Sequence, residues 1–71
     1  MNEEQLRKLH EVFNDCWKFT KKWCNPQSED EWRQLLQDAE ELYQKDKNSI
    51  FRQRLISETI LEINRSSKKE Q

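Results

Sequence analysis

The chain has 71 residues, a formal net charge of −1, 38% charged residues, no glycine and a single proline. This length is enough for one domain, and a domain of this size buries only about 60% of the surface that its unfolded chain exposes. The near-neutral charge gives no overall attraction to nucleic acid or to anionic membranes. Val12 is the only valine and strong helix formers are abundant, so the composition predicts an all-α fold.

Helical periodicity divides the chain into three amphipathic segments, at residues 3–24, 29–46 and 49–65. In the first segment, charged side chains occupy one half of the helical wheel, which is typical of a helix that buries its other face. That apolar half consists of Leu6, Leu9, Val12, Phe13, Cys16, Trp17, Phe19, Thr20, Trp23 and Cys24. The sequence therefore predicts a three-helix bundle as a single domain at 1–66, with a frayed polar tail at 67–71.

The corner between the first two helices carries strong boundary signals. Pro26 disfavours helical geometry at Asn25, so the first helix is expected to end by Cys24. Ser28 and Glu31 fit a capping box, in which the serine side chain accepts from the Glu31 amide and the Glu31 carboxylate accepts from the Ser28 amide. Alternatively, Asn25 and Pro26 could cap a second helix that starts one turn sooner.

The third helix is apolar on nearly all sides. Its main stripe consists of Phe51, Leu55, Ile56, Thr59, Ile60 and Ile63. Ile50 and Leu61 fall on the opposite side, which predicts a second contact surface, either a dimer contact or a groove for a partner. The alternative is that both are simply exposed, as single apolar residues often are. Before this helix, Asn48 is expected to tolerate a left-handed turn, with Asn48 or Ser49 as the cap.

No arrangement typical of an enzyme or a metal site is present. Cys16 and Cys24 would lie about 12 Å apart along a continuous helix, too far for a disulfide, and they lack the short spacing of structural zinc ligands. His10, the only histidine, is about two turns from Cys16 and out of hydrogen-bond reach. We therefore predict no catalytic residue, no metal and no cofactor, with both thiols on a buried face.

The chain also lacks the features of a membrane or secreted protein. It has no apolar run of about 18 residues that could span a bilayer. Its first residues, MNEEQLRKLHEVF, do not have the basic-then-apolar order of a signal peptide. A cytoplasmic location without membrane contact is expected, and cysteines stay reduced there.

Aromatic and basic side chains supply the candidate binding residues. All three tryptophans fall on predicted buried stripes, but Trp17 lies near the edge of its stripe, and tryptophan is enriched at binding hot spots. The predicted partner-binding set is Trp17, Lys18, Lys21, Lys22, Ile50, Arg54 and Leu61. A protein partner is favoured, with a homodimer as a further option. The rival is nucleic-acid binding through the third helix, where Arg52 and Arg54 lie near the start, although a solvated face explains such charges equally simply.

Three segments, VFNDCWKFTKKWCNP, DEWRQLLQDAEELYQK and LEINRSSK, follow one another in a recognisable order. The order is carried by Trp17, Lys21, Lys22, Trp23, Asp30, Trp32, Leu35, Ala39, Leu42, Phe51, Leu55, Glu62 and Arg65. It covers nearly the whole chain and resembles a group of small helical proteins of unknown function encoded in phages and prophages of Gram-positive bacteria. The last segment departs from the acidic-aliphatic-Glu-Arg run that is more usual in this group.

The resemblance implies a phage context and no particular activity. In that context we expect a protein–protein adaptor or inhibitor directed at a host component of defence or replication. The alternative function is a small DNA-binding transcriptional regulator.

Overall fold

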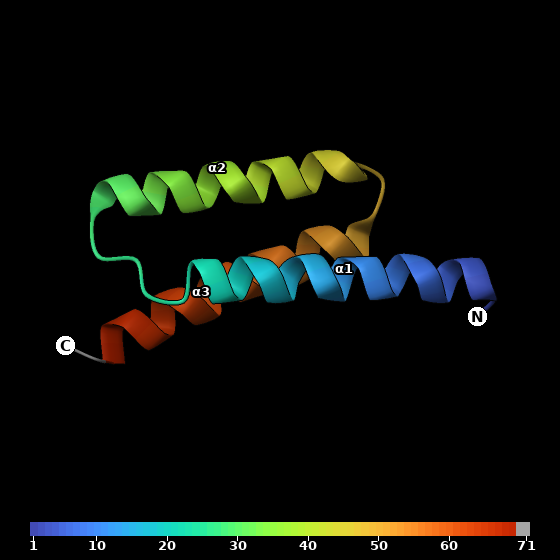
Figure 1. Ribbon diagram of the computed structural model, residues 1–71, viewed down its shortest axis with the longest axis horizontal. Coiled ribbons are helices and arrows are strands. Elements are labelled where there is room, and N and C mark those ends of the chain that lie inside the picture. The colour runs from blue at the N-terminus through green and yellow to red at the C-terminus, as the bar shows by residue number, and fades with distance from the viewer. Residues whose placement is uncertain (70–71) are drawn as a thin grey trace.

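The computed structural model describes the backbone of residues 1–69 and the side chains of residues 1–67. It contains three helices, α1 (Glu3–Lys22), α2 (Glu29–Lys45) and α3 (Ile50–Lys69). Helices α1 and α3 run in the same direction, and α2 runs antiparallel to both (Figure 1). The predicted all-α three-helix bundle is therefore confirmed.

Two of the helix ends differ from the predicted ones by two residues or more, while the end of α2 and the start of α3 differ by one residue each. Helix α3 continues to Lys69, beyond the predicted end at residue 65 and into the segment predicted to fray. Residues 70 and 71 of that predicted tail lie outside the described residues. Helix α1 ends two residues sooner than predicted, at Lys22, and Trp23 is its C-cap.

Side-chain caps fix where the first two helices begin. Asn2 and Gln5 form a capping box at the start of α1, with each side chain accepting from the backbone amide of the other at 2.8–2.9 Å. Ser28 caps α2 as predicted, since its hydroxyl accepts from the Glu31 amide. The Glu31 carboxylate, however, accepts from the Gln27 amide at 2.6 Å, one residue before the predicted donor. Helix α2 begins at residue 29, so the sooner start at Asn25 is not adopted.

The turn before α3 is made by side chains. The Asp46 carboxylate accepts from the Asn48 amide, and the Ser49 hydroxyl accepts from the Arg52 amide at 3.1 Å. No residue has a positive φ in the described part of the chain, so the left-handed turn predicted at Asn48 is wrong. The Asp46 side chain provides an alternative way to turn the backbone.

The hydrophobic core lies between the three helices and is small. Its buried side chains are Val12, Cys16, Phe19, Trp23, Leu35, Ala39, Ile56 and Ile63. Leu35 of α2 and Ile56 of α3 are fully buried. Because only one stripe of each helix enters this core, a large share of the apolar side chains stays outside it.

The bundle is elongated. Its principal extents are 44 × 21 × 17 Å and its radius of gyration is 13.1 Å, whereas a compact domain of this length would have about 11 Å. The first turns of α1 extend past the end of α2 and the start of α3 (Figure 1). One end of α1 is therefore not covered by the other helices.

Candidate functional site

Helix α1 carries two separate apolar stripes. One is buried and contributes Val12, Cys16 and Phe19 to the core. The other is exposed, with exposed fractions of 56% for Leu6, 54% for Phe13 and 60% for Trp17. At about 100° per residue the two stripes are centred about 120° apart, so α2 and α3 cover only one of them. The prediction that Leu6, Phe13 and Trp17 lie on a buried face is wrong, and Trp17, which lies near the edge of its predicted stripe, is the most exposed of the three.

We call the exposed stripe the α1 seam and define it as Leu6, His10, Phe13 and Trp17, all of which are exposed. Phe51 of α3 extends it, because the rings of Phe13 and Phe51 pack edge to face with their centroids 5.5 Å apart. Phe51 itself is 40% exposed. The seam therefore continues from α1 onto the start of α3 as one aromatic surface.

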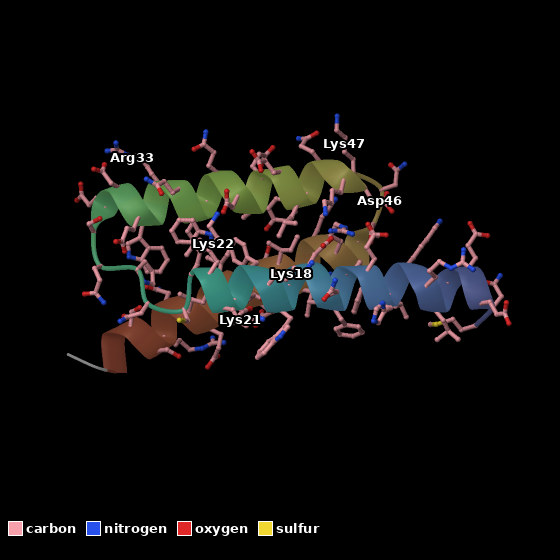
Figure 2. All side chains as sticks on the ribbon, viewed as in Figure 1. Lys18, Lys21, Lys22, Arg33, Asp46 and Lys47 are labelled. Carbon is pink, nitrogen blue, oxygen red and sulfur yellow. The ribbon has the colours of Figure 1, made fainter. Side chains whose placement is uncertain are left out.

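The three lysines of the predicted binding set have different surroundings. Lys21 lies on the side of α1 away from α2, and its ammonium is 5.5 Å from the centre of the Trp17 ring (Figure 2). Lys22 lies between α1 and α2, where it donates to Asp38 at 2.9 Å. Lys18 is exposed beside the groove between these two helices. Of these three lysines, only Lys21 thus lies beside the α1 seam.

The groove between α1 and α2 has a volume of about 330 Å³. Its lining residues are Asp15, Lys18, Phe19, Lys22, Asp38, Glu41, Leu42 and Lys45. Lys22 pairs with Asp38, and Lys45 pairs with Asp15. Since most of its charges are paired within the protein, this groove is a helix–helix contact with a solvated edge.

Asp38 joins the first two helices. Its Oδ2 atom accepts from the Lys22 ammonium and, at 2.8 Å, from the indole N–H of Trp23. The hydrogen bond from Lys22, with further help from Trp23 and from the lysine charge, lowers the pKa of Asp38 below 3.8 and outweighs the opposing effect of burial. The large Trp23 ring is buried with its only polar atom satisfied.

Arg52 is a buried ionic residue that the sequence pattern did not indicate. Its side chain is 4% exposed and donates to Asp15 of α1 at 3.0 Å, and Asp15 also accepts from Lys45 of α2 at 3.2 Å. The Glu11 carboxylate is 4.0 Å away. The prediction that Arg52 belongs to a solvated or nucleic-acid-facing surface is wrong, because this side chain joins all three helices.

The two cysteines have different surroundings. Burial is the main cause that raises the pKa of the Cys16 thiol, and Asp15 adds to it against the opposing charge of Arg52. A raised pKa keeps this thiol protonated and makes it a poor nucleophile. Cys24 is exposed, which corrects its predicted place in the core. No group of metal-binding side chains is found in the described part of the chain.

The remaining members of the predicted set lie on α3. Ile50 is 65% exposed and Leu61 is 47% exposed, and Arg54 is exposed between them. The two apolar residues are eleven positions apart, or about 16 Å along the helix. They are too far apart to form one continuous patch with each other, so the alternative of singly exposed residues describes them better.

Comparison with protein-family models, with curated proteins and with solved structures gave no match to this chain. The resemblance to phage and prophage proteins therefore stays a prediction. Within residues 1–69, none of the helices is both long enough and apolar enough to cross a membrane.

Proposed function

We propose that the protein acts by binding another protein through the α1 seam, as an adaptor or inhibitor. The observation that carries this proposal is the row of large apolar side chains, Leu6, Phe13 and Trp17, each more than half exposed on one side of one helix. Contiguous apolar surface of this kind is typical of an interaction site. Trp17 is the natural anchor, since a tryptophan buried on binding contributes much of the free energy of association.

The sequence resemblance suggests where this binding takes place. In a phage context the partner is a host component of defence or replication, and the two proteins bind in the host cytoplasm. This part of the proposal rests on the resemblance, whereas the binding surface rests on the exposed side chains of α1.

A DNA-binding role has less support from the arrangement of charges. Arg52, one of its two predicted arginines at the start of the third helix, is buried and paired with Asp15. Arg54 is exposed, but the formal net charge of −1 supplies no overall attraction to phosphate.

The test is a pull-down from the lysate of a Gram-positive bacterium, with the tagged protein and with a Trp17→Ala variant. We expect captured proteins that survive nuclease treatment and that are lost with Trp17→Ala. Leu36→Ala is the matched control, because Leu36 is 54% exposed and belongs to α2, which contributes no residue to the seam. If Trp17→Ala captures the same proteins as the unchanged chain, the seam is not the binding surface.

A further inference from the structure

The α1 seam has the spacing of a coiled-coil contact. Its four positions, 6, 10, 13 and 17, are separated by four, three and four residues, which is the a/d spacing that lets two helices pack along each other. The seam extends over about 16 Å of α1, or three helical turns. It is therefore long enough to accept a helix laid lengthwise and is not limited to a single inserted side chain.

Basic side chains line the open edge of the seam. In the heptad register the row directly beside it holds Arg7, Asn14 and Lys21, all of them exposed. Neither Arg7 nor Lys21 has an ion-pair partner among the side chains of residues 1–67. Glu11 lies one row further out and extends toward Arg52. The open edge thus offers two positive charges that a bound helix could neutralise.

The other edge of the seam leads into the protein itself. The residues in the equivalent row on that side are Leu9, which is half-buried, and Cys16, which is buried. Cys16 belongs to the core, and neither side chain carries a charge that a partner could pair with. Only the basic edge can therefore form charged contacts with an incoming helix.

These charges argue against a second copy of the chain as the occupant. Two seams packed antiparallel around a two-fold axis would bring their open edges together, so that Arg7 of one copy faces Lys21 of the other. Like charges placed opposite each other disfavour association. A parallel pair would need the edge that is already buried in the core.

We propose that the α1 seam binds a helix of another protein, with apolar side chains at heptad spacing and aspartate or glutamate beside them. This inference rests on the proposed function and adds the chemistry of the partner to it. The acidic row of the partner would lie over Arg7 and Lys21, and its apolar row would cover Phe13 and Trp17. Phe51 would close the far side of the contact.

The exposed area of the protein agrees with such a contact. The chain exposes 5706 Å², whereas a compact monomer of 8.8 kDa would expose about 4,800 Å². The excess of about 900 Å² is close to the roughly 800 Å² that one partner contributes to an interface of standard size.

The experiment uses the full chain and three fluorescein-labelled synthetic helical peptides as probes. The peptides share leucine at the a and d positions and differ only in the flanking positions, which are all glutamate, all glutamine or all lysine. We expect the glutamate peptide to bind more tightly than the lysine peptide by about tenfold, because two flanking contacts change from attraction to repulsion. Fluorescence anisotropy at low and high salt gives the dissociation constants.

Variants of the chain assign the binding to the seam. The double variant Arg7→Glu with Lys21→Glu should reverse the order and favour the lysine peptide. Trp17→Ala should weaken the glutamate peptide by about 30-fold, and the control Leu36→Ala, at an exposed leucine of α2, should leave its affinity unchanged. Equal binding of all three peptides, or binding of none, overturns the proposed partner chemistry. A stable dimer of the chain that buries the seam between its two copies also overturns it.

Failure of this inference can be told apart from failure of the proposed function. If proteins are captured from lysate in a Trp17-dependent manner but the peptides show no preference for charge, the seam is a binding surface for a different partner chemistry. If capture is independent of Trp17, the proposed function itself fails.

Discussion

Arg52 connects the three helices at one buried point. Its guanidinium donates to Asp15 of α1 and reaches the backbone carbonyl of Leu42 of α2 at 3.5 Å. Asp15 in turn accepts from Lys45. A buried charge is costly unless it is paired, so each member of this group depends on the others.

Replacing Asp15 by alanine should therefore lower the free energy of unfolding by about 3 kcal/mol, since it leaves a buried guanidinium without its carboxylate. This is a large share of the roughly 4–10 kcal/mol expected for a domain of this length. The double variant Asp15→Leu with Arg52→Met should cost less than the single one, because no charge is left buried. Urea denaturation followed by far-UV circular dichroism measures both, and a double variant that is worse than Asp15→Ala contradicts this explanation.

Asp38 makes the free energy of unfolding depend on pH. The pKa of Asp38 is lowered in the folded protein, so the ionised carboxylate stabilises the fold above pH 3.8. This contribution to stability is lost as the pH falls through the lowered pKa. Unfolding free energies of the unchanged protein and of Asp38→Asn should therefore differ most above about pH 5 and converge in stronger acid. Denaturation series at several pH values test this, and a difference that does not shrink with acid rules out the role of Asp38.

At the scale of single helices, two neighbouring leucines show how narrow the buried stripes are. Leu35 is fully buried in the core, whereas Leu36, the next residue of α2, is 54% exposed. Helical periodicity places both in one apolar cluster of the segment 29–46, together with Trp32, Ala39, Leu42 and Tyr43. The rotation of about 100° between them places one inside and the other outside.

The pair offers a matched test of the packing. Leu35→Ala should lower the free energy of unfolding by about 3 kcal/mol, because it removes buried methyl groups and leaves a cavity. Leu36→Ala changes the same chemical group on the same helix and should cost less than about 1 kcal/mol. Thermal or urea unfolding of the two variants, side by side, decides the matter; similar losses would mean that Leu36 is buried.

Much of the fold could be predicted from the sequence because helices are specified locally. Apolar side chains recurring every three or four residues predicted the three helices. Ser28 predicted the first residue of α2 correctly. Local rules did not decide which part of a wide apolar half meets a neighbour. For that reason Leu6, Phe13 and Cys24 were expected inside and lie outside.

The ionic contacts of Arg52 could not be predicted from the sequence either, because they also depend on how the helices pack. Arginine in a helix usually indicates a solvated face, and Asp15 and Arg52 are far apart in the chain. Only the packing of α1 against α3 brings them together. Trp17 was expected on the buried face, and only its place at the edge of the stripe indicated it as a candidate binding residue. The seam as a continuous row was not predicted.

On the scale of the whole molecule, shape and charge together favour a monomer that has not covered its apolar surface. The elongated bundle leaves the start of α1 uncovered, and the basic edge of the seam opposes pairing of two copies. The homodimer that the sequence suggested through Ile50 and Leu61 receives no support from their separation on α3.

A single charge reversal should therefore create the dimer. In Arg7→Glu, the new carboxylate of one copy would face Lys21 of the other at both ends of an antiparallel pair, and the apolar seams could then meet. Sedimentation equilibrium should show a monomer for the unchanged chain and added dimer for Arg7→Glu. The double variant Arg7→Glu with Lys21→Glu restores like charges and should be a monomer again; equal masses for all three proteins contradict the antiparallel argument.

The three indoles provide the chain with an optical readout of its own. Trp23 is buried beside Asp38, Trp32 is partly buried, and Trp17 is exposed beneath the ammonium of Lys21. Iodide should be drawn to that ammonium and quench Trp17 selectively, while caesium should be repelled from it. A partner bound to the seam would shield Trp17, so a fall in the fraction of the emission that iodide can quench would report occupancy of the seam without any attached dye. The emission of the buried Trp23 would report whether the bundle is intact.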